Sequence, residues 1–169
     1  MFHVKQYLDA LRSWNTIHRL IGNVSCETLF KESLDAIKNS EKDLSNFSTM
    51  SDLGAGSGIL GAAWLSLNPS NKCIFLEPDR KAAAFLLSYF GSAAFSERLE
   101  SPGILDRMLR KYPGTNTTNT FIASRAFSSN DTLENIYIKS ELSEYELYNF
   151  EANPKVLDSY SLVKKLYKK

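Results

Sequence analysis

Apolar residues in the first part of the chain recur at the three- and four-residue spacing of an amphipathic helix. One run contains Val4, Tyr7, Leu8, Leu11 and Trp14, and a second contains Leu29, Phe30, Leu34 and Ile37. A polar connection through Asn15, Gly22 and Asn23 separates the two runs. We therefore expect two helices within residues 1–45.

From residue 47 onward, short strand-like runs alternate with helix-like runs, which is typical of a parallel sheet with crossover helices. The predicted strands are 47–53, 73–76, 92–96, 121–124, 145–150 and 161–166. The predicted helices are 59–67, 79–90, 104–111 and 131–142. The expected fold is one α/β domain over 1–169, with a mostly parallel core at 46–169. Its sheet would have seven strands or slightly fewer, with helices on both faces and a helical extension at the N-terminus.

Composition narrows the class of protein. The chain has 169 residues, 43% of them hydrophobic, which is enough for one buried core. Its 20 Lys and Arg against 19 Asp and Glu give a net charge of +1, so any nucleic-acid binding would rest on a local basic patch. Cys26 and Cys73 form no disulfide framework or metal-ligand pattern, and no apolar segment is long enough for a bilayer. We expect a cytoplasmic protein with no metal and no membrane contact.

The most informative stretch is 52–61, Asp-Leu-Gly-Ala-Gly-Ser-Gly-Ile-Leu-Gly, which follows a predicted strand and begins a helix. Its alternate glycines allow a turn that side chains would block, and they let the backbone approach a ligand at the helix start. Gly56, Gly58 and Gly61 have the GxGxxG spacing of dinucleotide-binding folds, and Glu77 stands close to the position of the ribose-binding acid. Three interpretations remain: a methyl-donor site, a nicotinamide or flavin site, and a turn that only connects two elements.

Asp52 favours the first interpretation. It places a carboxylate at the end of the first core strand, two residues before Gly54, which suits the amino or sulfonium region of a cationic ligand. The arrangement acid-x-Gly-x-Gly-x-Gly resembles motif I of the Rossmann-like, class I S-adenosylmethionine-dependent methyltransferases. This resemblance implies that Glu77, at the end of the second strand, accepts hydrogen bonds from both ribose hydroxyls of S-adenosylmethionine.

Further motifs sharpen the resemblance and occur in order along the chain. They are Trp14-Asn15, Leu34-Asp35, Leu76-Glu77 with Lys81 and Phe85-Leu86, Arg98-Leu99-Glu100, and Ser124-Arg125-Ala126-Phe127. With residues 52–61, this series is similar to the glucose-inhibited division protein B family, bacterial methyltransferases that modify N7 of a guanine in 16S ribosomal RNA. The resemblance spans about residues 8–130.

The resemblance implies a cofactor site and a mechanism. Its expected cofactor-binding residues are Asp52, Gly54, Gly56, Gly58, Ile59, Glu77, Leu99, Glu100 and Arg125. Leu99 and Glu100 would flank the adenine, and Arg125 would orient cofactor or substrate at the mouth of the site. Guanine N7 has an unprotonated lone pair at neutral pH, so attack on the methyl group needs no general base. We therefore expect catalysis by positioning, without a catalytic side chain.

Departures from the family lie on the substrate side. Members usually have proline where this chain has Leu60, histidine where it has Glu32 and a basic residue where it has Ala82. The basic residues available for RNA are Arg80, Lys81, Arg107, Arg110, Lys111, Arg125, Lys155, Lys164, Lys165, Lys168 and Lys169. Two alternatives follow: a compact monomeric enzyme whose partner is ribosomal RNA or the small subunit, or a diverged relative with a different or lost substrate.

Overall fold

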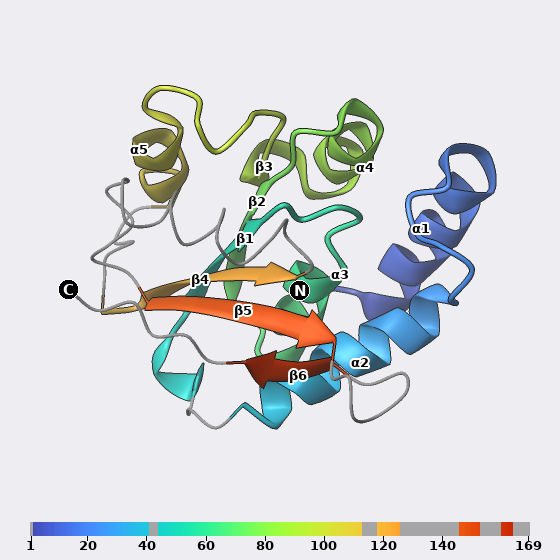
Figure 1. Cartoon of the computed structure of the whole chain (residues 1–169), viewed down its shortest axis with the longest axis horizontal. Helices are drawn as coiled ribbons and strands as arrows, with labels where there is room; N and C mark the ends of the chain where they lie inside the picture. The colour runs from blue at the N-terminus through green and yellow to red at the C-terminus, as the bar shows by residue number, and fades with distance from the viewer. Residues whose placement is uncertain (1, 41–43, 113–117, 126–145, 153–159, 164–169) are drawn as a thin grey trace.

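A single sheet of six strands forms the centre of the computed structural model, which describes residues 2–40, 44–112, 118–125, 146–152 and 160–163 (Figure 1). The strand order is β3-β2-β1-β4-β5-β6. The strands are β1 (Thr49–Leu53), β2 (Lys72–Leu76), β3 (Ala94–Phe95), β4 (Thr120–Arg125), β5 (Glu146–Ala152) and β6 (Tyr160–Val163). Neighbours from β3 to β5 pair in parallel, whereas β6 runs antiparallel to β5.

Helices cover both faces of this sheet, as the sequence predicts. They are α1 (Val4–His18), α2 (Cys26–Lys38), α3 (Ile59–Leu67), α4 (Arg80–Phe90) and α5 (Ile104–Leu109), with short 3-10 turns η1 (Leu44–Asn46) and η2 (Gly91–Ala93). Because alternate strand residues point to opposite faces, Met50 and Phe75 pack with residues of α1 to α4, whereas Leu53 and Ile74 pack against α5. No helix among the described residues is long and apolar enough to cross a membrane.

Local sequence signals explain where several helices begin. Ser25 accepts a hydrogen bond from the Thr28 backbone N–H at the start of α2, and Asp79 accepts from the N–H groups of Lys81 and Ala82 at the start of α4. Helix α3 begins after Gly58, and its first six residues are all buried. Its apolar character on every side reflects a position between the sheet and α2.

The strand register aligns the carboxyl ends of β1, β2 and β4. Leu53 at the end of β1 lies opposite Leu76 on one side and Ser124 on the other. The residues that come next after Leu53, Leu76 and Ser124 are Gly54, Glu77 and Arg125. All three therefore lie at the same level, at the carboxyl edge of the parallel strands, where open α/β sheets bind their ligands.

The boundaries differ from the predicted ones in a few places. Strand β1 begins at Thr49 rather than Phe47, because Phe47 closes the η1 turn through its backbone N–H to Leu44 O at 3.0 Å. Strand β3 contains only residues 94–95, because 91–93 form a 3-10 turn, and α5 ends at Leu109 rather than 111. The predicted helix over 131–142 lies outside the described residues, and six described strands agree with a slightly reduced sheet.

Candidate cofactor site

The glycine-rich loop between β1 and α3 is built by backbone hydrogen bonds. The N–H groups of Gly54 and Ala55 both donate to Leu76 O, at 2.9 and 3.0 Å, and tie the loop to the end of β2. The Gly58 N–H donates to Ala55 O at 2.7 Å and closes a four-residue turn. Gly56 and Gly58 have φ angles of 55° and 78°, a region that other L-residues rarely adopt. The loop conformation therefore depends on glycine.

The glycines at 56, 58 and 61 have different structural roles. A Cβ on Gly56 would meet no atom of the described residues within 4 Å, which leaves that side of the loop open to a ligand in this part of the chain. A Cβ on Gly58 would lie 2.6 Å from Leu86 Cδ2, and one on Gly61 would overlap the Phe75 ring and lie 2.7 Å from Cys73 Sγ. Gly58 and Gly61 thus allow α3 to pack directly on β2 and α4, whereas Gly56 leaves room at the site.

Glu77 is the central acid of the site, and its carboxylate is fixed by two backbone donors. The side chain is 6% exposed, with Oε2 accepting from Gly56 N at 2.6 Å and Oε1 from Asp79 N at 2.7 Å. A carboxylate oxygen has two lone-pair sites, so each oxygen retains one further acceptor position. Two acceptor positions side by side match the two hydroxyls of a vicinal diol such as ribose.

Asp52 is buried near the end of β1. Its side chain lies on the same face of β1 as Met50, the face covered by α1 to α4, and it is 1% exposed. Its Oδ2 accepts a hydrogen bond from the Gly61 N–H at 3.1 Å. Its pKa is raised to about 7, mainly by burial and also by the nearby charge of Glu77, although the Gly61 N–H and Arg125 act in the opposite direction. The Asp52 carboxylate thus accepts a hydrogen bond from the first turn of α3, and its contact with the cationic part of a ligand stays a prediction.

Arg125 is held against α2 at the end of β4. Its Nη1 donates to Ser33 Oγ at 2.6 Å and to Leu29 O at 3.4 Å, and its Nη2 forms an ion pair with Glu32 Oε2 at 3.3 Å. The two charged side chains are only 13% and 12% exposed. Glu32, noted above as a departure from the family, is therefore the ion-pair partner of a predicted site residue.

The remaining predicted residues surround these groups. Ile59 is buried as the first residue of α3, directly after the loop. Leu99 is buried in the same apolar cluster as Leu53 and Leu76, the last residues of β1 and β2, whereas Glu100 is exposed. The structure thus brings the glycine loop, Asp52, Glu77 and Arg125 to one edge, with Leu99 packed beneath the ends of the central strands.

Tyr7 belongs to this edge as well, although the spacing of apolar residues predicts only that it lies on the apolar face of a helix. Its hydroxyl donates to Ser57 O, within the glycine loop, at 2.9 Å. A tyrosine at a fully buried helix position was the one available signal, because a buried hydroxyl requires a hydrogen-bond partner. The identity of that partner, fifty residues away, depends on tertiary packing.

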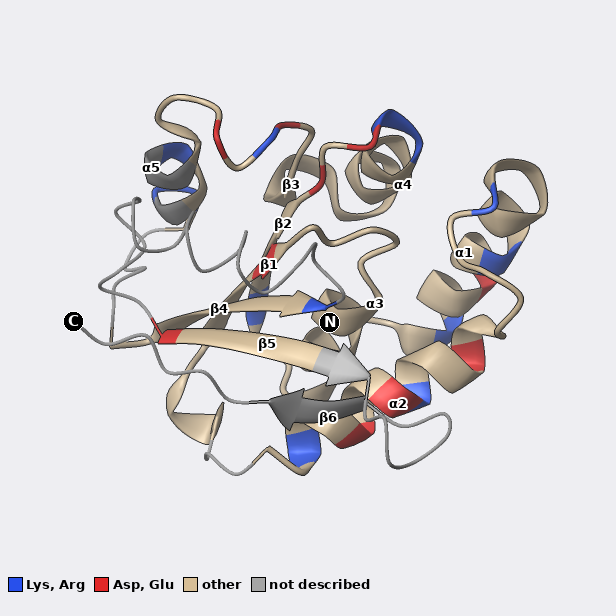
Figure 2. Cartoon of the chain, viewed as in Figure 1, with Lys and Arg blue, Asp and Glu red and all other residues tan. Residues whose placement is uncertain are grey.

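Basic and acidic residues lie close together around α4 and α5, the helices that carry several of the basic residues named above for RNA. Figure 2 shows Lys and Arg on α4 and α5, with Asp and Glu on the segments leading into those helices. Arg107 of α5 forms an ion pair with Glu97, which reduces its free charge. The five C-terminal lysines named above lie outside the described residues. The described part of the chain therefore shows a mixed charge distribution around these helices.

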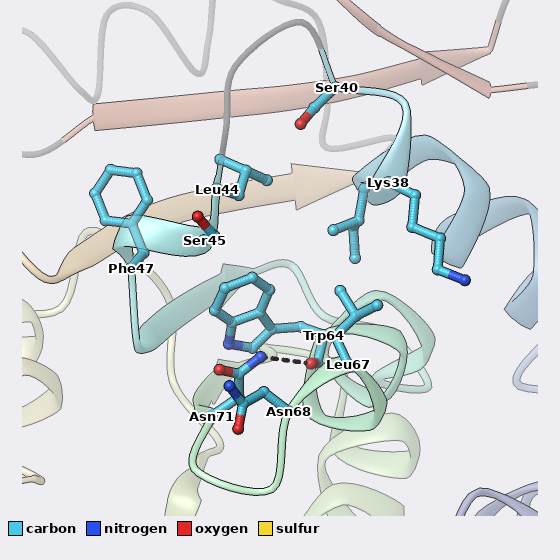
Figure 3. Close-up of a pocket in the computed structure, with 10 residues that line it drawn as sticks. Lys38, Ser40, Leu44, Ser45, Phe47, Trp64, Leu67, Asn68 and Asn71 are labelled. Carbon is cyan, nitrogen blue, oxygen red and sulfur yellow. Dashed lines mark hydrogen bonds between the residues drawn. The ribbon is translucent and has the colours of Figure 1, made fainter.

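A cavity of about 310 Å³ lies at the opposite edge of the sheet (Figure 3). It is lined by residues around the start of β1, the end of α3 and the start of β2, among them Phe47, Trp64, Asn68 and Asn71. The Asn71 side-chain amide donates to Trp64 O at 2.9 Å and closes part of its wall. None of the predicted site residues lines this cavity, so it is separate from the glycine-loop edge.

Comparisons with known proteins match the chain to one family. The family model described as "GidB: rRNA small subunit methyltransferase G" matches residues 2–149. Ribosomal RNA small subunit methyltransferase G from Helicobacter pylori is 31% identical over 130 residues, covering 77% of this chain and 70% of that protein. The protein of the same name from Helicobacter acinonychis is 30% identical over the same length and with the same coverage.

Solved structures to which the chain is similar include two at low sequence identity. The plantazolicin methyltransferase BpumL in complex with SAH has a TM-score of 0.46 and 8% identity, covering 89% of this chain and 57% of that one. Precorrin-6y C5,15-methyltransferase from Geobacter metallireducens has a TM-score of 0.42 and 15% identity, covering 75% of this chain and 63% of that one.

Proposed function

The chain belongs to the GidB family of rRNA small subunit methyltransferase G, and on this premise we propose that it transfers a methyl group from S-adenosylmethionine to N7 of a guanine in 16S ribosomal RNA. Membership confirms the resemblance identified from the motifs, and with it the expectation of a methyltransferase of small-subunit ribosomal RNA that uses S-adenosylmethionine. The target atom is the part of the proposal that needs its own test.

The observation that carries the proposal is the oriented carboxylate of Glu77 beside the open side of Gly56. The two free acceptor positions of Glu77 suit the ribose hydroxyls of the cofactor, and the absence of atoms near Gly56 among the described residues leaves room for it. Leu99 supplies apolar surface next to the ends of β1 and β2. The residues present therefore fit S-adenosylmethionine.

The chemistry requires positioning rather than proton transfer. When bound, S-adenosylmethionine supplies a methyl group activated by a positively charged sulfur. Guanine N7 carries a free lone pair, so the protein needs only to align the two partners and exclude competing orientations. Glu77 and the loop would hold the cofactor, Asp52 would support the start of α3 through the Gly61 N–H, and Arg125 would orient cofactor or RNA at the end of β4.

We further propose that the chain acts as a monomer in the cytoplasm, where it meets ribosomal RNA or the assembling small subunit. The near-neutral net charge of +1 offers little general attraction to RNA. Binding would then depend on local contacts from exposed basic residues such as Arg80 and Lys81 of α4, and its affinity should fall as the salt concentration rises.

The test is transfer of tritium-labelled methyl groups from S-adenosylmethionine to three substrates: deproteinised ribosomal RNA, isolated small subunits and a protein extract, each at low and moderate salt. We expect label in 16S RNA, and strand cleavage at one guanine after borohydride reduction and aniline treatment. Label found in protein alone would exclude RNA as the substrate. Retained cofactor binding without any label would indicate a diverged relative, and calorimetry showing tighter binding of NAD would indicate a nicotinamide protein.

A further inference from the structure

The hydroxyl group of Tyr7 links the N-terminal helix to the glycine loop. Tyr7 lies in the first turn of α1, its side chain is fully buried, and its hydroxyl donates to the backbone oxygen of Ser57 at 2.9 Å. Burial raises the pKa of Tyr7 well above its ordinary value, so the hydroxyl remains a donor throughout the physiological range. A phenylalanine would fill the same space without this hydrogen bond.

The ring that carries this hydroxyl is held in an aromatic cluster. Its centroid lies 5.8 Å from Phe2, 5.4 Å from Tyr89 and 5.8 Å from Phe90. Tilted and edge-on contacts at these distances are favourable. Helix α1 packs beside α4 and beside α3, the helix that follows the glycine loop (Figure 1). The cluster therefore fixes the ring, and the ring fixes the position of the hydroxyl.

The peptide group between Ser57 and Gly58 is held from both ends. Its oxygen accepts from Tyr7, and its N–H donates to Ala55 O at 2.7 Å. The preceding turn residue, Gly56, donates its N–H to Glu77. A rotation of the Ser57–Gly58 peptide would therefore disturb the turn that places the Gly56 N–H against the Glu77 carboxylate.

We propose that Tyr7 is a positioning residue for the cofactor site, acting through Ser57 on the loop and so on the orientation of Glu77. This inference rests on the proposed function, because it assumes that Glu77 binds the ribose of S-adenosylmethionine. Tyr7 itself touches no substrate. Its contribution is a loop conformation that exists before the cofactor arrives, which reduces the ordering needed on binding.

The variant Y7F tests the proposal, because it keeps the ring and removes only the hydroxyl. We expect the Kd for S-adenosylmethionine and for S-adenosylhomocysteine to rise about 3- to 10-fold, as for the loss of one neutral hydrogen bond. The KM for S-adenosylmethionine should rise by the same factor, while kcat at saturating cofactor and the KM for RNA stay unchanged. Amide exchange at Gly56 and Gly58 should become faster, with exchange in β1 and β4 unaltered.

Y89F is the matched control, since Tyr89 belongs to the same aromatic cluster but donates to His3 O at 3.5 Å, away from the loop. Its Kd should equal that of the unaltered chain. Unchanged binding by Y7F, or an equal loss in Y89F, would overturn the proposal. A Y7F chain that does not fold would also overturn it, because the hydroxyl would then support the whole fold rather than the loop.

Calorimetry separates this inference from the proposed function, because cofactor binding is measured without RNA. An unaltered chain that binds S-adenosylmethionine but methylates no RNA would contradict the proposed function, and the comparison of Y7F with Y89F would still decide the role of Tyr7. An unaltered chain that binds neither S-adenosylmethionine nor S-adenosylhomocysteine would overturn both.

Discussion

Replacing Asp52 with asparagine isolates the effect of a buried charge beneath the glycine loop. The Asp52 carboxylate is 1% exposed and accepts from the Gly61 N–H at 3.1 Å. An asparagine oxygen can accept the same hydrogen bond at almost the same volume, but it carries no charge. The variant D52N therefore removes the ionisation of this side chain while keeping its link to α3.

The pKa of Asp52 determines the size of the expected effect. Burial is the main reason that it rises from 3.8 to about 7 in the folded chain. Between these values the folded state retains a proton that the unfolded state releases, so stability falls as pH rises through this window and levels off above it. A shift of this size corresponds to about 4 kcal/mol of unfolding free energy.

Urea unfolding of the unaltered chain and D52N, at half-unit steps from about pH 4 to about pH 8.5, measures this linkage. The stability of D52N relative to the unaltered chain should grow by about 1.4 kcal/mol per pH unit, and reach a plateau near about 4 kcal/mol. D52A should show the same pH dependence as D52N, but its free energy of unfolding should be lower than that of D52N at every pH, because D52A also removes the acceptor for the Gly61 N–H. A difference between D52N and the unaltered chain that is constant with pH would refute the reasoning.

Three further predictions concern the site and its support. E77Q removes the charge and one acceptor from the proposed ribose contact, so calorimetry should show the binding free energy for S-adenosylhomocysteine weakened by about 1.5–3 kcal/mol. The control E27Q, on the exposed surface of α2, should bind as the unaltered chain does, and an unchanged affinity of E77Q would contradict the role of Glu77. G61A should lower the unfolding free energy by about 1–3 kcal/mol in urea titrations, because its Cβ would overlap the Phe75 ring. G22A should be neutral, because its Cβ would meet no atom of the described residues within 4 Å. A G61A variant as stable as the unaltered chain would contradict the tight packing of α3 on β2. E32Q should lower stability by about 1–2 kcal/mol by weakening the ion pair with Arg125, and a double-mutant cycle with R125Q should show coupling, whereas strictly additive effects would exclude it.

Sequence periodicity predicted the elements that local signals define. Helix α3 begins and ends as expected, because Gly58 has a positive φ before it and Asn68-Pro69 follows it. Phe47 was assigned to the first strand although it closes a turn, since a buried aromatic residue fits the apolar pattern of either structure. A pattern of apolar positions cannot separate these two cases.

Local motifs predicted several residues of the site, whereas the contacts that join distant segments were not predictable. The glycine spacing and the acid after β2 identified Gly56 and Glu77, which the strand register then brings together. The contacts of Tyr7 with Ser57 and of Arg125 with Glu32 join segments 50 and 93 residues apart, and they depend on how α1 and α2 pack. The direction of the Asp52 side chain follows from the alternation of β1, once it is known which face of the sheet carries α3.

The order of the strands also bears on synthesis of the chain. β1 lies in the interior of the sheet, with β2 on one side and β4 on the other, and Thr49 pairs with Thr120, about seventy residues later. Until β4 has left the ribosome, one side of β1 presents unpaired backbone groups, and none of its five residues has the full burial that it has in the folded chain. Such an edge can pair with another chain. A nascent chain stalled or cleaved before β4 would therefore lack Arg125 at the cofactor edge and would be prone to aggregate through β1.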